Sequence, residues 1–176
     1  MKQIQRKANI TATGKYLPEK VLTNHDMEKL VETSDEWIQT RTGIRERRMV
    51  QNGQATVDMS TNAVHDLMEK YDLSPEEIDA IIVATVTPDM ILPCSAALIQ
   101  NNINAINAWG YDLSAACSGF LFGLESGAAL IESGRCKKVI VIGADTMSSI
   151  LNYKDRNTCI LFGDGAGAVL LESSEE

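Results

Sequence analysis

Two apolar runs rich in β-branched residues constrain the fold more than any other feature of this sequence. They are AIIVATVT (80–87) and KKVIVIGAD (137–145). Strands that are apolar on both faces are typical of parallel sheets covered by helices, whereas half-exposed strands alternate apolar and polar residues. The segments around the two runs show helical spacing and glycine or proline stops. The sequence therefore predicts an α/β fold.

The other segments complete this architecture. Further strands are expected at 8–13, 107–114 and 168–172, helices at 56–71, 95–101 and 117–133, and shorter helical turns at 26–32 and 34–38. Strands and helices that alternate in this order predict a five-stranded, mostly parallel sheet with helices on both faces.

The glycine-rich segment GDGAG (163–167) has the composition of a phosphate loop. It lacks the lysine of a Walker motif, and the residues after it, AVLLES, are typical of a strand. Phosphate loops open a helix, because the N–H groups at a helix N-terminus bind the anion. The segment is therefore expected to form a tight turn.

Length and charge restrict the class of protein. A chain of 176 residues fits one domain over 1–176. Its net charge of −8 is opposite to the balance typical of nucleic-acid binders. No apolar run approaches the roughly 20 residues that span a bilayer, and no apolar signal-peptide segment follows the basic N-terminus. We expect neither a nucleic-acid nor a membrane partner.

The cysteines indicate free thiols. Cys94, Cys117, Cys136 and Cys159 form no CxxC pair, and the chain has two histidines. A zinc site needs tighter ligand spacing, and a disulfide scaffold is usually a smaller, secreted chain. We expect no metal site and a cytoplasmic location, with Cys136 and Cys159 as structural residues.

Cys117 is the strongest candidate for a nucleophile. It follows the expected strand WGYDLS and opens a helix, so it lies at a strand's carboxyl end, where open α/β sheets bind ligands. The positive end of a helix dipole stabilises a thiolate. Small neighbours such as Ala116 and Gly119 leave room for a substrate. The alternative is a small buried side chain.

No obvious base accompanies this thiol. Cys94 is a second candidate, but it follows a loop rather than a strand. A nucleophilic cysteine usually works with a general base. Neither His25 nor His65 lies beside an expected strand end, so the sequence offers a thiol without an evident partner.

A basic cluster stands out in this acidic chain. It consists of Arg41, Arg45, Arg47 and Arg48, and Trp37 precedes it. Guanidinium groups suit the phosphates of a ligand or an acidic protein partner, and an indole ring can stack on a base. A solvated surface explains the cluster equally well.

Three separate stretches resemble a known family. They are TSDEWIQTRTGIRERR (33–48), YDLSAACSGF (111–120) and DRNTCILFGDGAGAVLL (155–171). In this order they are similar to β-ketoacyl-acyl-carrier-protein synthase III, a condensing enzyme of the thiolase-like superfamily. The resemblance runs from Tyr16 to Leu171.

The resemblance implies specific roles. Cys117 occupies the position of the family's nucleophile, and its backbone N–H that of an oxyanion-hole donor. Trp37 and Arg156 match the pair that holds the adenine ring of coenzyme A. Thr33 matches a residue that contacts the same ring, and Arg41 one near the coenzyme's phosphates.

The resemblance also places an acyl pocket. Leu161 and Phe162 fall near it, and Leu92 falls where the family places an apolar residue that reaches into the partner subunit's pocket. Phenylalanine is common at that position, so the length of the primer stays open. The implied partners are an acyl-CoA, acyl-carrier protein and a second copy of the chain, paired through an edge strand at 107–113. Coenzyme A thioester is a substrate, and no cofactor is implied.

In the family a second, similar half follows and supplies the catalytic His and Asn. The resemblance therefore implies an N-terminal half that is inactive alone and whose parent condenses acetyl-CoA or another primer with malonyl-acyl-carrier protein. Two alternatives stay open. One is a non-catalytic module that docks acyl-carrier protein or assembles with a partner, and the other is a condensing enzyme of secondary metabolism.

Overall fold

The two apolar runs form neighbouring central strands of a sheet. The computed structural model describes residues 6–51 and 53–175. β4 (Ala80–Ala84) is buried along its whole length and pairs in parallel with β6 (Lys138–Thr146). Alternate residues of β6 face opposite cores, with Ile140 on one side and Val141 on the other. Apolar cores on both sides explain why the run does not alternate with polar residues.

β4 ends earlier than the run that predicted it. Residues 85–87 leave the sheet because their polar groups bind the side chain of Asp145. Oδ1 of Asp145 accepts hydrogen bonds from Thr85 Oγ1 at 3.1 Å, from Val86 N at 2.8 Å and from Thr87 Oγ1 at 3.1 Å. The carboxylate thereby fixes the loop that leaves the carboxyl end of β4.

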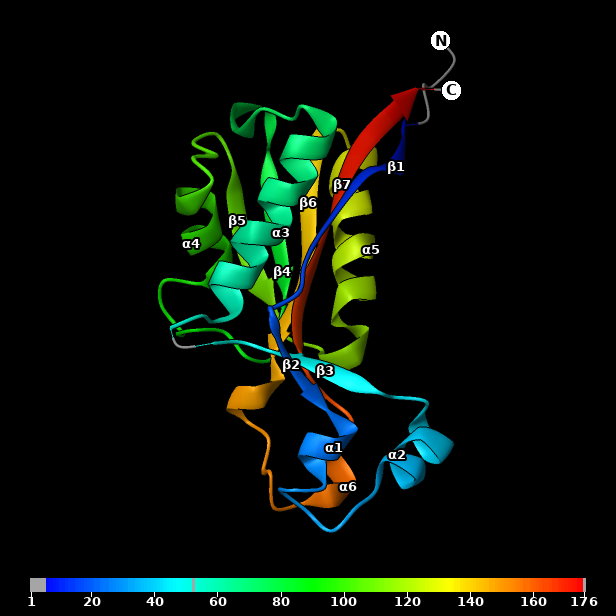
Figure 1. The fold of residues 1–176 in the computed structure, drawn as a ribbon. Coiled ribbons are helices and arrows are strands. Elements are labelled where there is room, and N and C mark those ends of the chain that lie inside the picture. Colours follow the sequence, from blue (N-terminus) through cyan, green and yellow to red (C-terminus); the bar gives the residue numbers. More distant parts are fainter. Residues whose placement is uncertain (1–5, 52, 176) are drawn as a thin grey trace.

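The sheet has the strand order β1–β7–β6–β4–β5 (Figure 1). Its edges are β1 (Arg6–Tyr16) and β5 (Trp109–Leu113), and β7 (Asp164–Glu175) lies between β1 and β6. The α/β fold with five strands is confirmed. The sheet is mixed, because β7 runs antiparallel to both of its neighbours. Only the β5–β4 and β4–β6 pairings are parallel, although β1 points the same way as these three strands.

The prediction of a glycine turn at 163–167 is wrong. β7 already begins at Asp164, and Gly165 and Gly167 pair with Asp145 and Gly143 of β6. β1 pairs with the other side of the same segment, with Lys15 opposite Gly167. Pairing with β6 holds both glycines extended, and Gly167 is also paired with β1, so tertiary pairing overrides their preference for turns.

Helices cover both faces of the sheet, as predicted. α3 (Thr56–Tyr71) and α4 (Ser95–Asn102) pack on one face, and α5 (Gly119–Glu132) packs on the other (Figure 1). The bounds of α3 match the prediction. α5 begins two residues later than expected, because a 3₁₀ turn, η2 (Ala116–Ser118), precedes it. Two further 3₁₀ turns are η1 (Pro75–Glu77) and η3 (Met147–Ser149).

A small lobe extends from the end of the sheet where β4 and β6 have their carboxyl ends (Figure 1). It contains the antiparallel pair β2 (Lys20–Thr23) and β3 (Glu46–Met49), with α1 (Asn24–Met27), α2 (Asp35–Thr42) and α6 (Arg156–Cys159). The β2–β3 pair and α6 were not predicted.

The lobe has its own apolar core and clear helix ends. Met27, Ile38, Cys159 and Ile160 form that core. α1 begins before the predicted turn at 26–32 and is shorter, because it ends at Met27; Thr23 caps its start, and Thr23 Oγ1 accepts a bond from Asp26 N. Gly43 ends α2 in the left-handed conformation at φ 72°.

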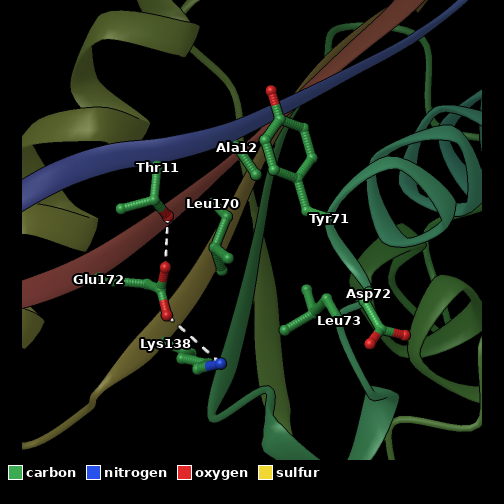
Figure 2. A pocket seen from close by; sticks show the side chains of 8 residues that line it. All are labelled: Thr11, Ala12, Tyr71, Asp72, Leu73, Lys138, Leu170 and Glu172. Carbon is green, nitrogen blue, oxygen red and sulfur yellow. Dashed lines mark hydrogen bonds and ion pairs between the residues drawn. The ribbon is translucent and has the colours of Figure 1, made fainter.

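A polar pocket lies beside Lys138 at the start of β6, whereas the small lobe extends from the carboxyl end of that strand (Figure 2). Lys138 Nζ lies 3.0 Å from Glu77 Oε1 and 3.3 Å from Glu172 Oε1, and Thr11 donates to Glu172. The ion pairs with Glu77 and Glu172 raise the pKa of Lys138 against the opposing effect of burial. In this pocket of about 210 Å³, Lys138 and Glu172 therefore satisfy each other's charge.

Within the described residues, no helix is long and apolar enough to cross a bilayer. The same residues hold no group of three or more His, Cys, Asp and Glu side chains placed to bind a metal ion.

Replacement of Gly14 by alanine tests the contact between β1 and α3. A Cβ at Gly14 would lie 2.2 Å from the Ala63 carbonyl oxygen and 2.6 Å from Leu67 N, both backbone atoms of a helix. We expect Gly14→Ala to lower the free energy of unfolding by about 3 kcal/mol, because neither atom can move alone. Urea denaturation measures the change.

Gly167→Ala is the matched control. It lies on the neighbouring strand, and the nearest atom to its added Cβ is Gly14 O at 4.0 Å. It should leave stability unchanged or raise it slightly. Equal stabilities of the two variants would contradict the close packing of β1 on α3.

Candidate active site

Cys117 lies in a sharp turn at the carboxyl end of β5. Ala116, directly before it, has φ 47°, a left-handed conformation that non-glycine residues rarely adopt. Ser118 N donates to Ala115 O at 3.2 Å, and this bond closes the turn. Gly119 is buried, and a Cβ there would lie 3.3 Å from Ala84 Cβ. The turn therefore packs against the end of β4 and leaves the Cys117 side chain exposed.

The other three thiols are less accessible. Cys94 is half-buried, and Cys136 and Cys159 are buried. Burial raises the pKa of the Cys136 and Cys159 thiols, which disfavours their reactive thiolate forms. Exposure thus separates Cys117 from the other cysteines in the way the sequence predicts.

Neither histidine accompanies Cys117. His25 lies in α1 of the small lobe, where Nδ1 is 3.4 Å from Glu28 Oε2. His65 is exposed on α3, which packs on the face of the sheet opposite α5. The described residues therefore offer no histidine base beside the thiol.

Exposed apolar side chains occupy the segments around this end of the sheet. Leu92, in the loop between β4 and α4, is 82% exposed. Leu161 and Phe162, between α6 and β7, are also exposed, as are Leu121 and Phe122 at the start of α5. These surfaces do not enclose an acyl group by themselves, so the acyl-pocket prediction for Leu92, Leu161 and Phe162 stays a prediction.

A second candidate element lies in the small lobe around Trp37. Ser34 caps α2 and accepts a bond from Trp37 N at 3.1 Å, which fixes the start of the helix. The guanidinium of Arg41, one turn later, lies 4.3 Å from the indole centroid. Arg156, from the distant α6, lies 4.9 Å from the same centroid. The structure therefore brings Trp37, Arg41 and Arg156 together.

The fourth predicted residue, Thr33, adjoins this group. Arg156 Nη1 donates to the carbonyl oxygen of Glu32 at 3.0 Å. The hydroxyl of Thr33, the next residue, is buried without a hydrogen-bond partner. A buried polar atom without a partner is unfavourable and marks a place where a ligand can add a bond.

A cleft of about 490 Å³ opens beside the arginine of α6. Residues 30–32 line one side and residues 154–157 the other. Its lining holds two cations, Lys154 and Arg156, and two carboxylates, Glu32 and Asp155. The carboxylate of Asp155 binds Thr158 Oγ1 and Asn157 N, and these bonds hold its pKa below the usual range.

The arginine cluster divides into residues of different kinds. Arg41 stacks on Trp37, whereas Arg47 is only 4% exposed and is therefore neither part of a phosphate patch nor a solvated surface residue. Sequence reasoning missed this burial, because β3 is short and polar and gives no apolar pattern that could reveal it.

Comparison with known proteins shows which proteins this chain resembles. The sequence profile of 3-oxoacyl-[acyl-carrier-protein (ACP)] synthase III matches residues 111–176. The β-ketoacyl-[acyl-carrier-protein] synthase III of Chlorobaculum tepidum is 60% identical over 171 residues, which are 97% of this chain and 52% of that protein. This chain is therefore similar to synthases III over nearly its whole length. It spans about half the length of the curated relatives it matches.

Solved structures show the same relation. The 3-oxoacyl-[acyl-carrier-protein] synthase III of Aquifex aeolicus VF5 is 48% identical, with a TM-score of 0.93 over 96% of this chain and 55% of that chain. The priming β-ketosynthase of the R1128 polyketide pathway is 34% identical, with a TM-score of 0.93 over 99% of this chain and 52% of that chain. The thiolase-like fold is thereby confirmed.

Alkylation of the native protein tests the exposure of the thiols. We expect iodoacetamide to modify Cys117 first and the half-buried Cys94 more slowly. Cys136 and Cys159 should react only on unfolding, because their thiols are buried and disfavour the thiolate. Peptide mapping by mass spectrometry over time measures the order. Protection of Cys117 at the level of Cys159 would contradict the exposed turn.

Proposed function

We propose that this chain supplies the nucleophile and the coenzyme A site of a β-ketoacyl-acyl-carrier-protein synthase III. The exposed Cys117 in its turn at the end of β5 carries the proposal, together with the similarity to synthases of this type. The parent enzyme is then a cytoplasmic acyltransferase that starts fatty-acid synthesis. The reaction needs neither a metal nor a redox cofactor.

In the first half-reaction, Cys117 Sγ attacks the thioester carbonyl of an acyl-CoA, with acetyl-CoA as the favoured primer. The C–S bond to coenzyme A breaks, the coenzyme leaves as its thiol, and an acyl-enzyme thioester remains. The Cys117 backbone N–H, in η2, is the proposed oxyanion donor.

In the second half-reaction, malonyl-acyl-carrier protein loses carbon dioxide, and the electron pair forms a carbanion. This carbanion attacks the acyl-enzyme carbonyl, and the Cys117 thiolate leaves. The product is a β-ketoacyl-acyl-carrier protein. A His and an Asn from a second half would stabilise the developing charge, since neither histidine of this chain accompanies the thiol. The 176 residues alone should therefore condense poorly.

Coenzyme A binding is proposed for the small lobe. Trp37 and Arg156 would hold the adenine ring between an indole and a guanidinium, and both are planar groups that stack on aromatic rings. Because Arg156 lies 4.9 Å from the Trp37 centroid, it must swing away from the indole to admit the ring. Thr33 would gain the hydrogen-bond partner that its hydroxyl lacks, and Arg41 would face the phosphates.

The acyl pocket and the subunit contact complete the proposal. Leu161 and Phe162 would border the acyl chain, and Leu92 would enter the pocket of a second subunit. β5 is an edge of the sheet, with β4 on one side, so its free side can pair with the same strand of another copy. Acyl-carrier protein is the proposed protein partner.

Substitution of Cys117 tests the proposed nucleophile. Cys117→Ala in the full-length protein should abolish transfer of radiolabelled acetyl from acetyl-CoA to the enzyme, because no acyl-enzyme can form. Cys94→Ala, at the half-buried thiol, serves as the control and should retain labelling. Undiminished labelling of Cys117→Ala would refute the proposal.

Substitution of Trp37 tests the proposed adenine site. Trp37→Ala should raise KM for acetyl-CoA about tenfold with little change in kcat, because stacking of a base on an aromatic ring contributes roughly 1–3 kcal/mol. KM for acetyl-pantetheine, which lacks the nucleotide, should stay the same. An equal increase in KM for acetyl-CoA and acetyl-pantetheine would contradict adenine binding at Trp37.

The fold similarity to a priming β-ketosynthase of a polyketide pathway favours one alternative, a condensing enzyme of secondary metabolism. The chemistry of Cys117 would be the same, and only the primer would differ. The rates with a series of acyl-CoA primers distinguish the two, since a preference for a longer or branched primer over acetyl-CoA supports the alternative.

A further inference from the structure

The buried side chain of Arg47 connects the two walls of the proposed adenine site. On one side, Arg47 Nη1 donates to Asn24 Oδ1 at 2.6 Å. On the other side, Nε donates to the carbonyl oxygen of Ile160 at 2.9 Å, and Nη2 donates to the same oxygen. Ile160 is the C-cap of α6, the helix that begins with Arg156. One guanidinium thus holds α6 to the start of α1.

Asn24 extends this connection to both ends of α2. It is 1% exposed, and its Nδ2 donates to Asp35 Oδ1 and to Ile44 O, both at 2.8 Å. Asp35 is the first residue of α2, and Ile44 follows the glycine that ends it. The amide of Asn24 therefore spans the helix that carries Trp37.

Burial of the Arg47 charge is unfavourable for stability, which indicates that its hydrogen bonds serve to hold segments in place. Arg47 is 4% exposed, and within the described residues no carboxylate forms an ion pair with it. A buried charge without a counter-ion is unfavourable, and here carbonyl and amide oxygens alone compensate for lost water. An apolar residue would fill β3 at lower cost but could not form three directed hydrogen bonds to two separate segments.

We propose that Arg47, acting through Asn24, is a positioning residue that sets the distance between the Trp37 wall and the Arg156 wall of the nucleotide site. The guanidinium links Ile160 at the end of α6 to Asn24, and Asn24 fixes both ends of α2. Neither residue touches the ligand in this proposal, which rests on the proposed coenzyme A site. Ligand affinity depends on such spacing, because a misplacement of about 1 Å weakens a stacked or bidentate contact strongly.

Binding of adenosine 3′,5′-bisphosphate, the nucleotide part of coenzyme A, tests the proposal without reference to catalysis. Isothermal titration calorimetry on the full-length protein measures Kd. Arg47→Lys keeps the charge but lacks the planar fork that reaches both Asn24 and Ile160. Asn24→Ala leaves the bonds to Ile160 in place and removes the link to α2. Both variants should raise Kd about tenfold.

Lys138→Met is the control for loss of stability. Lys138 is a partly buried cation with two carboxylate partners, Glu77 and Glu172, and it lies at the start of β6, away from the small lobe. Figure 2 shows its ion pair with Glu172. Its loss should lower the melting temperature while Kd stays at the wild-type value. Arg47→Lys and Asn24→Ala should also keep kcat with acetyl-pantetheine close to the wild-type value. If part of the protein were merely unfolded, the apparent kcat would fall.

Three outcomes separate the inference from the function on which it rests. Weak binding by Arg47→Lys and Asn24→Ala, with normal binding by Lys138→Met, supports the positioning role. Wild-type affinity in folded Arg47→Lys and Asn24→Ala overturns the positioning role and leaves the coenzyme site intact. Failure of the wild-type protein to bind the bisphosphate overturns the proposed site itself and the inference with it.

Discussion

Burial of β4 and β6 on both faces is the constraint on which the rest of the structure depends. A strand that is apolar on both sides needs a cover on each side, and helices provide it here as α3 and α4 on one face and α5 on the other. Because β5, β4 and β6 run parallel, their carboxyl ends meet at one edge of the sheet. The Cys117 turn and the small lobe both extend from this edge, so the exposed thiol and the contact between Trp37 and Arg156 lie at one end of the molecule.

The elements that could be predicted are those whose signal is local. The helix over 56–71 has its own periodicity and stops, and its bounds match the prediction. Cys117 could be placed at a strand end because WGYDLS and the small residues after it carry that information in sequence. The elements that escaped prediction depend on distant partners. β2 and β3 are four residues each, and β3 is mostly polar and carries Arg47, whose buried partners lie on other segments.

Two interpretations failed for the same physical reason. Glycine at 165 and 167 favours a turn when it is considered alone, but strands on both sides hold the segment extended. An arginine between two charged neighbours is typical of a surface, yet Arg47 finds enough oxygen acceptors to be buried. In both cases tertiary contacts outweigh the local preference. The contact of Trp37 with Arg156 joins residues that are far apart in the sequence. It was expected from family resemblance, because no spacing in the sequence indicates it.

The stacking of Arg156 on Trp37 has a kinetic consequence. The Arg156 guanidinium already contacts the indole face of Trp37 and the Glu32 carbonyl oxygen. In the proposed site, the adenine ring of the ligand would have to displace these contacts before it could stack on the indole. The free energy of binding is then the difference between the stacking of adenine on Trp37 and the stacking of Arg156 that it replaces, and it is smaller than either. When the adenine dissociates, Arg156 would stack on Trp37 again. The proposed adenine site would therefore bind its ligand weakly and release it quickly, as suits the proposed reaction, in which coenzyme A leaves before the second substrate binds.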